Sequence, residues 1–461
     1  MSGARGVTTH LQVLLESLRR LLRRNAHQRV AHILVKARRE DVASVLRFLD
    51  EPQRQQVFEL LPSDEARAGV LAELDAHIVE RLARGRSTQQ MARVINLMSV
   101  DEQARLLSSL TEELRAELLA ALQAALHPDE ARELEELLHY ERDSAGGIMS
   151  TDFFSLPEET TCEQAIRALQ GARDVEMVFY IYVVNAEMHL CGVVSLRELV
   201  TNPPQRTLAE IRTAEVISVK LSSDQEEVAQ LAARYNLLAL PVVDEHNRLV
   251  GIITIDDVID VIREEATEDI LKMAGADESA FEDSSVWSNF VTRAPWLFAT
   301  WLGGLAASVL IGVFEHQLEQ NVALAAFIPI VLGMGGNVGT QTATIMVRGL
   351  ATGRVVYGLG GRYLGRELGV GALLGVFYGL LLALYAVVRY YADGALPLGL
   401  TVGVSVWASM VTAAVVGAST PLMFHRLKID PAVATGPLVT TAVDVLGILV
   451  YFLVAQRVMG L

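Results

Sequence analysis

Residues 430–444 read DPAVATGPLVTTAVD, and the last of them, Asp444, stands near the middle of a long apolar stretch. A helix needs about 20 apolar residues to cross the hydrocarbon of a bilayer, and this stretch is long enough. A carboxylate at the centre of an inserted helix costs about 2.5 to 3.5 kcal/mol, so it is retained mainly where it has a task. Asp444 is therefore the first candidate for a functional residue.

Four more uncharged stretches are long enough to cross a membrane. Together they predict five spans: Ala294–Phe314, Gln320–Val347, Leu368–Val388, Gly394–His425 and Pro431–Gln456. Seven basic residues flank the spans on the side of Arg293, against two on the other side. Because basic loops stay in the cytoplasm, we expect a plasma (inner) membrane protein with a cytoplasmic N-terminus and an external C-terminus.

Charge divides the chain near residue 292. From Arg293 onward there are six acids and nine bases, whereas the preceding part has 49 acids and 30 bases. This division excludes a soluble single-domain enzyme, a disordered chain and a disulfide-stapled module. The sequence also lacks a phosphate-binding P-loop, a His-Glu-x-x-His motif and a nucleophile elbow, which argues against a pump or a membrane enzyme.

The interrupted start of the fifth stretch offers only oxygen ligands. Two prolines flank Gly436, and Thr435 and Thr440 add hydroxyls. Broken helix at membrane depth is tolerated where it lines a cavity or is buried in protein. With Asp444, unwound carbonyls and hydroxyls suit hard cations such as Mg²⁺ and Ca²⁺. The alternative is a protonated Asp444 that hydrogen-bonds a neighbouring helix.

The second stretch has a matching irregularity, in which Pro329 precedes the glycine-rich run 333–342. Glycine weakens a helix but lets backbones approach closely. Tight helix packing and a pore-lining role, with Asn337 facing the pore, are the two explanations, and they can hold for opposite faces. Because one acid in five helices makes a poor channel, we expect a homodimer that brings two Asp444 carboxylates to one axis.

An internal repeat occupies residues 148–262. The segment Tyr182–Ser195 aligns without gaps with Pro241–Thr254, 59 residues later. Each copy reads as a strand, a polar turn and a second strand, flanked by amphipathic helices such as Glu163–Gln170 and Asp224–Arg234. The pattern resembles a tandem CBS domain, and its recurrence at a fixed period makes the resemblance specific.

A strongly acidic helix, Asp256–Lys272, is expected after the repeat. Successive i,i+4 positions hold Asp256, Asp260, Glu264 and Glu268, and each like-charge pair costs a few tenths of a kcal/mol. Residues 215–283 contain 17 acids and five bases. A solvated face is one explanation. The other is that divalent cations bridge these acids to those of the repeat, such as Asp224 and Glu226, and that cation loss releases the helix.

Residues 1–140 are nearly all helix-forming. The apolar pattern of Phe48–Leu61 recurs 49 residues later in Leu97–Leu110, which favours a stack of short helices. The predicted fold class is a multidomain membrane protein with an all-α superhelical N-terminal domain, an α/β tandem CBS domain, a connecting helix and five membrane helices. The expected boundaries are 1–140, 141–255, 256–292 and 293–461.

The whole chain resembles the MgtE family of magnesium transporters. The strongest matches are Pro329 with Gly333–Gln341, the stretch 430–444 and the acidic helix. The resemblance implies a homodimeric Mg²⁺ channel that holds hydrated Mg²⁺ at Asp444 and is closed by its connecting helix, the plug, when cytoplasmic Mg²⁺ is high. It implies no enzyme activity and no nucleic-acid partner. The regulatory ligands that it implies match Asp257, Asp260, Glu265, Glu268, Asp269, Glu226 and Asp430.

Two positions depart from the family pattern. The segment Met98–Glu102 has fewer acids than the family commonly places there, and Gly436 stands where some relatives have a side chain. CBS pairs often bind adenine nucleotides, and Thr254 with Asp257 fits the ribose-contacting pair, so ATP binding is a hypothesis. Two other functions stay open: a Na⁺- or H⁺-coupled divalent cation antiporter, and a non-transporting membrane-anchored CBS sensor.

Overall fold

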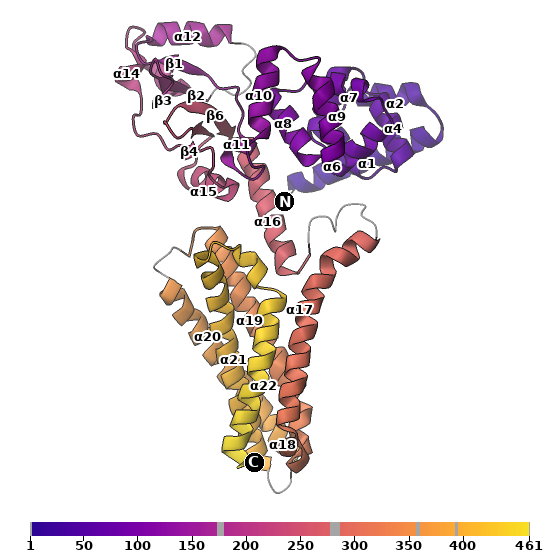
Figure 1. Cartoon of the computed structure of the whole chain (residues 1–461), viewed down its shortest axis with the longest axis vertical. Helices are drawn as coiled ribbons and strands as arrows, with labels where there is room; N and C mark the ends of the chain where they lie inside the picture. Colours follow the sequence, from indigo (N-terminus) through magenta and orange to yellow (C-terminus); the bar gives the residue numbers. More distant parts are fainter. Residues whose placement is uncertain (1, 173–178, 277–285, 356–359, 392–394, 461) are drawn as a thin grey trace. The chain divides into compact units, whose positions relative to one another are not determined.

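Short helices make up the first part of the chain (Figure 1). The computed structural model describes residues 2–172, 179–276, 286–355, 360–391 and 395–460. The predicted helical N-terminal domain is confirmed. Its helices are α1 (Ser2–Arg23), α2 (His27–Leu34), α3 (Arg39–Arg47), α4 (Glu51–Glu59), α5 (Asp64–Ala72), α6 (Ala76–Arg84), α7 (Thr88–Ile95), α8 (Val100–Ser109), α9 (Glu112–Gln123), α10 (Pro128–Leu138) and α11 (Ala145–Ile148).

The recurring apolar pattern of this domain is only partly a core pattern. Leu49 and Met98, one repeat apart, are buried, but the residue before each of them, Phe48 or Leu97, is exposed. The buried members join one continuous hydrophobic cluster that runs through the domain. The domain is therefore held together by one apolar face of each short helix, as amphipathic periodicity requires.

The internal repeat forms two three-stranded sheets of the same design. In each sheet the first strand pairs parallel and the third antiparallel to the middle strand. Val183 pairs with Gly192 and Val242 with Gly251, and both ladders shift register directly after that pair. The predicted CBS pair is confirmed. Its strands are β1 (Ser155–Pro157), β2 (Tyr180–Val184), β3 (Leu190–Ser195), β4 (Val219–Lys220), β5 (Ala239–Val243) and β6 (Leu249–Thr254).

The helices of the CBS pair and the acidic helix follow the prediction closely. They are α12 (Cys162–Gly171), α13 (Leu196–Thr201), α14 (Leu208–Ile211), α15 (Gln225–Tyr235) and the acidic helix α16 (Ile255–Met273). The second CBS copy shares its hydrophobic core with the N-terminal helices, whereas the first copy has a core of its own. The chain divides into two compact units, Met1–Val261 and Ile262–Leu461.

Five helices of the second unit are long and apolar enough to cross a membrane, as predicted. In this unit α19, α20, α21 and α22 lie side by side, and α17 lies along α22 (Figure 1). Gly394, the expected start of the fourth span, and residues 277–285 of the expected linker lie outside the described residues. The elements are α17 (Val286–Val313), α18 (Glu315–Gln320), η2 (Val322–Phe327), α19 (Ile328–Ala351), α20 (Gly360–Arg389), α21 (Ala395–Arg426), η3 (Pro431–Ala434) and α22 (Pro437–Met459).

Candidate pore and gating site

The helix break that the sequence predicts lies immediately before α22. The short 3₁₀ helix η3 ends at Ala434, and α22 begins at Pro437 after Gly436, whose backbone (φ −74°, ψ −116°) is not helical. Proline is well placed in the first turn of a helix, where its missing N–H has no partner to lose. Asp444 therefore lies two turns inside a regular helix, downstream of the break.

The glycine-rich run of the second span lies in an unbroken helix, and one of its faces is tightly packed. A Cβ on Gly335 would lie 2.7 Å from Ser409 Oγ and 3.2 Å from Val443 Cγ1. On Gly339 it would lie 3.1 Å from Val443 Cγ2. Pro329 leaves the helix intact because it stands in its first turn. These glycines let α19 approach α21 and α22 closely.

The opposite face of α19 is uncovered and polar. Gly333, Asn337 and Gln341, four residues apart, are exposed, and a Cβ on Gly333 would meet nothing within 4 Å. Val443 of α22 packs against both Gly335 and Gly339 of α19. Asn337 is midway between the two glycines and Asp444 follows Val443, so Asn337 and Asp444 lie at a similar depth. Amide side chains at this depth are costly unless they face water or another polar group. The packing explanation of the glycine run therefore holds for one face, and the pore-lining role of Asn337 on the other face stays a prediction.

Asp444 is half-buried, and no hydrogen bond or ion pair of its carboxylate is found within the described part of the chain. The two threonines that were predicted to line the pore behave differently from it. Thr435 is buried and its hydroxyl donates to Ala432 O at 2.9 Å. Thr440 Oγ1 donates to Gly436 O at 3.2 Å. Asp444 therefore differs from both threonines, because its carboxylate has no hydrogen-bond partner among the described residues.

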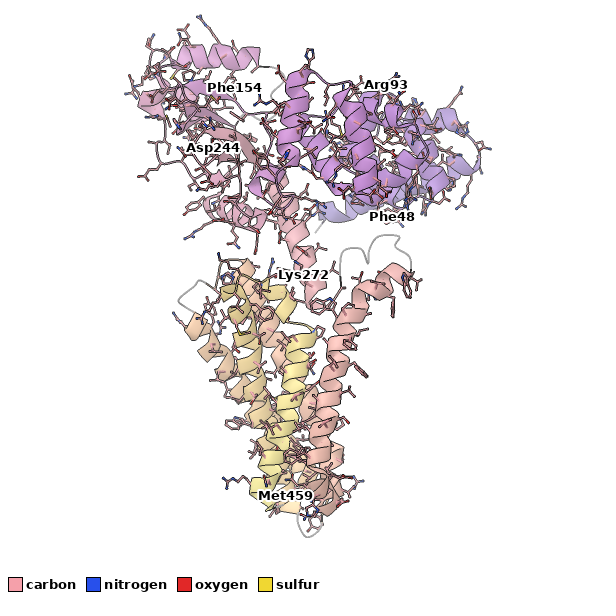
Figure 2. The ribbon with its side chains drawn as sticks, viewed as in Figure 1. Phe48, Arg93, Phe154, Asp244, Lys272 and Met459 are labelled. Atoms are coloured by element: carbon pink, nitrogen blue, oxygen red, sulfur yellow. The ribbon has the colours of Figure 1, made fainter. Side chains whose placement is uncertain are left out.

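A three-membered ion cluster lies near the end of α16. Lys272 Nζ lies 2.6 Å from Asp430 Oδ2 and 2.5 Å from Glu268 Oε1. Figure 2 shows Lys272 at the end of the membrane bundle that is opposite Met459. Burial alone would lower the pKa of Lys272, but its hydrogen bonds to Asp430 and Glu268 outweigh burial and raise that pKa. The ammonium group therefore stays charged and ties α16 to the loop before η3.

Asp269, the residue after Glu268 on α16, adds a further carboxyl group beside the Lys272 cluster. Burial raises the pKa of Asp269, and the carboxylate of Asp430 raises it further. Arg348, at the end of α19, and Lys272 act in the opposite direction. A raised pKa means that the charged form of the carboxyl group is disfavoured. An additional cation nearby would stabilise that charged form.

The backbone of α16 also reaches the helix break before α22. A Cβ on Gly436 would lie 2.6 Å from Met273 O. Gly275, in the left-handed conformation (φ +68°), turns the chain after α16 beside Trp296 and Pro437. Gly436 is therefore a contact point for the end of α16, because any side chain there would push the helix away.

Asp257, a predicted regulatory ligand, already has a basic partner in this structure. Arg105 Nη2 of α8 lies 2.9 Å from Asp257 Oδ1. Thr254 Oγ1, from the predicted nucleotide pair, donates to Asp257 Oδ2 at 2.7 Å. Burial raises the pKa of Asp257, while Arg105 and the Thr254 hydrogen bond lower it.

The remaining predicted ligands are not gathered into one site. Asp224 is the N-cap of α15 and accepts the Glu226 N–H at 2.8 Å, and Glu226 Oε1 accepts from Gln230 at 3.3 Å. Asp260 and Glu264 are on the exposed side of α16, and Glu265 is half-buried. Within the ranges described above, no three His, Cys, Asp or Glu side chains are placed to hold a metal ion.

Sequence reasoning missed Arg105, which pairs with Asp257, and Lys272, which pairs with Glu268 and Asp430. It treated the bases near the acidic helix as too few to matter. The Glu268–Lys272 pair could have been found, because the two residues are four apart on one helix. The Arg105–Asp257 pair could not, because the partners are 152 residues apart.

The architecture defines a class of protein: a multi-pass membrane protein with a helical domain and a CBS pair ahead of its membrane helices. Family models match in the same order. The model of the MgtE intracellular N domain matches residues 37–143, the CBS domain model matches 145–203 and 208–264, and the model of MgtE divalent cation transporters matches 328–454.

Individual relatives agree with the family models. The magnesium transporter MgtE of Thermus thermophilus is 42% identical over 70% of this chain and 72% of its own length. That of Bacillus subtilis is 36% identical over 71% and 72%. The crystal structure of the cytosolic domain of the Mg²⁺ channel MgtE in complex with ATP is 35% identical, with a TM-score of 0.50, over 54% of this chain and 99% of that one. The chain belongs to the MgtE family of magnesium transporters.

Proposed function

We propose that this chain forms a homodimeric Mg²⁺ channel, with Asp444 as the ion-binding residue of the pore. The observation that carries the proposal is the half-buried Asp444 carboxylate at membrane depth, level with the uncovered Asn337 of α19. An intramembrane acid with no cation beside it among the described residues is either protonated or neutralised by a cation from outside the chain, and its exposure to a polar face favours the cation. Two such carboxylates on a twofold axis match the charge of one divalent ion.

The chemistry of the pore lining favours Mg²⁺ held through its water. Carboxylate and amide oxygens accept hydrogen bonds from coordinated water, and Mg²⁺ gives up its hydration shell reluctantly. The backbone of α19 approaches α22 closely, so the two helices form one rigid wall. An inside-negative membrane potential of 100 mV favours entry by about 2.3 kcal/mol per charge, or roughly twice that for a divalent ion.

Dimerisation is proposed because, among the described residues, two surfaces of the membrane unit are exposed: the side of α17 that faces away from α22, and the polar face of α19. None of the residues in the apolar stretch of α17 is fully buried, and the polar face of α19 is exposed. Lipid can cover the first surface but not the second. In the orientation proposed, the soluble domains and Lys272 face the cytoplasm of a bacterial inner membrane, and Met459 faces outside.

The acidic helix is proposed as the gate. Glu268 and Asp269 of α16, with Asp430, bring three carboxyl groups to one place against the two cations Lys272 and Arg348. Cytoplasmic Mg²⁺ near these carboxylates would complete the neutralisation and hold α16 against Gly436. When Mg²⁺ falls, repulsion weakens this contact and the pore opens. The relatives named as magnesium transporters favour this reading over an antiporter or a non-transporting sensor.

Nucleotide binding is a subordinate proposal. The cytosolic domain of a relative has been crystallised with ATP, and Thr254 and Asp257 stand where CBS pairs contact ribose. Equilibrium dialysis with ATP tests it, and the absence of retained ATP would remove it.

The test of the pore is Mg²⁺ flux into proteoliposomes that contain a Mg²⁺-sensitive dye. We expect Asp444→Asn to abolish flux, because it removes both pore charges while keeping the side-chain size. Glu319→Gln in α18 is the matched control, because it also replaces a carboxylate by an amide, but at an exposed position outside the proposed pore. Equal flux in the Asp444 variant and the control would refute the assignment, and a requirement for a Na⁺ gradient would favour the antiporter.

A further inference from the structure

A line of charged side chains joins the helical domain to the start of α16. Arg105 Nη2 lies 2.9 Å from Asp257 Oδ1, and Arg39 Nε lies 3.6 Å from Glu73 Oε1. Asp260 is close enough to Glu73 to raise its pKa, although burial contributes more. We call Arg39, Glu73, Arg105, Asp257 and Asp260 the arginine seam.

Acids outnumber bases along the arginine seam. Besides its three carboxylates, Glu40 and Glu102 act on Glu73, and Asp101 and Glu102 act on Arg105. Asp257 is the most enclosed of the paired groups, with a side chain 16% exposed. Removing one partner from a partly buried charge pair leaves an uncompensated charge that destabilises the contact. Without Arg105, another cation would have to neutralise Asp257 and Asp260 at the start of α16. Otherwise the acids of the helical domain would repel them.

Arg105 lies on α8 directly before two buried residues, Leu106 and Leu107, which belong to the hydrophobic cluster that also contains Val258 and Val261 of α16. Arg105 itself is exposed, so its guanidinium reaches Asp257 from outside the core. A guanidinium is always charged and binds carboxylates through a planar pair of donors. It is therefore a permanent cation at this position.

We propose that Arg105, supported by Arg39, replaces a divalent cation at the contact between the helical domain and the start of α16. The first two turns of α16 then stay docked in low Mg²⁺, and Mg²⁺ acts only on the later turns, around Glu268 and Asp430. The proposal deepens the regulation proposed above, but it concerns docking within residues 1–261 and does not require that the chain conducts Mg²⁺.

Hydrogen–deuterium exchange of the full-length protein in nanodiscs tests this directly, with EDTA or with millimolar Mg²⁺. For peptides that cover residues 255–261, we expect the native chain to show the same protection in both buffers. Arg105→Gln should lower that protection in EDTA by up to about fivefold, the upper end of the effect of one partly exposed ion pair. Arg132→Gln is the matched control, because it removes an exposed i,i+4 pair with Glu136 in the same domain.

Two results would overturn the proposal. The first is a loss of protection at 255–261 when the native chain is moved from Mg²⁺ to EDTA, which would mean that divalent ions hold the seam. The second is an Arg105→Gln protein as protected in EDTA as the Arg132→Gln control. If Arg105→Gln fails to fold, Arg105→Lys replaces it, because it keeps the positive charge that the proposal requires, and it should be nearly as protected in EDTA as the native chain. Loss of its protection would count against the pairing.

Discussion

Replacement of Lys272 by methionine tests whether this residue holds the end of α16 in place. The change keeps the apolar stem of the side chain and removes the charge that now lies 2.6 Å from Asp430 and 2.5 Å from Glu268. The three side chains are between 32% and 43% exposed, so solvent screens both ion pairs. Only the pair with Asp430 joins α16 to another element, because Glu268 is on α16 itself. At up to about 1 kcal/mol for such a pair, docking should weaken by up to about fivefold in the closing equilibrium.

Hydrogen–deuterium exchange of peptides covering residues 262–273 measures that equilibrium. In EDTA, Lys272→Met should lose protection by the factor given above, and Lys272→Arg should keep most of it. Saturating Mg²⁺ should restore the methionine variant, because the vacated carboxylates can then share a divalent ion. Lys220→Met, which removes an exposed pair with Glu245, is the control. Unchanged protection of Lys272→Met in EDTA would refute the role assigned to Lys272.

Three further predictions follow from the same contacts. Gly436→Ala should raise Mg²⁺ flux at high cytoplasmic Mg²⁺, because its Cβ would lie 2.6 Å from Met273 O; flux still suppressed as in the native chain would contradict this. Asp269 has a raised pKa, so docking of α16 in EDTA should be strongest at acidic pH and weaken as pH rises through that pKa. Hydrogen–deuterium exchange of residues 262–273, corrected for the pH dependence of intrinsic exchange rates, measures this. Asp269→Asn should make that protection less dependent on pH. Gly417→Ala should destabilise the membrane unit by about 1 to 3 kcal/mol, because the added Cβ would lie 2.4 Å from Gly339 O. Gly369→Ala should not destabilise it, because a Cβ there would meet nothing within 4 Å. Thermal melts in detergent compare the two.

The sequence predicts the fold well where one local pattern decides it. The membrane helices follow from uncharged stretches, and the CBS pair follows from a 59-residue repeat whose strands have equal registers. It predicts less well where tertiary contacts decide. Arg105 is the example, because its pairing with Asp257 joins residues that are 152 apart in the chain and leaves no local pattern.

The candidate site divides in the same way. Asp444 is evident from sequence because an acid in an apolar stretch needs no structural context to be unusual. Arg105 and Lys272 are not, because each neutralises an acid that is 152 or 158 residues away. The domain boundaries at 140, 255 and 292 stay predictions, as do the ligands of regulatory Mg²⁺.

The central claim, that cytoplasmic Mg²⁺ closes the pore that admits it, is tested most directly by Mg²⁺ influx into proteoliposomes of defined orientation. The comparison is between low and high Mg²⁺ on the face that carries α16, with the inward gradient held constant. The account predicts flux that high Mg²⁺ on this face suppresses, and no flux for Asp444→Asn under either condition. Flux that is indifferent to Mg²⁺ on that face, or no flux from folded native protein under any Mg²⁺ or Na⁺ condition, would contradict it.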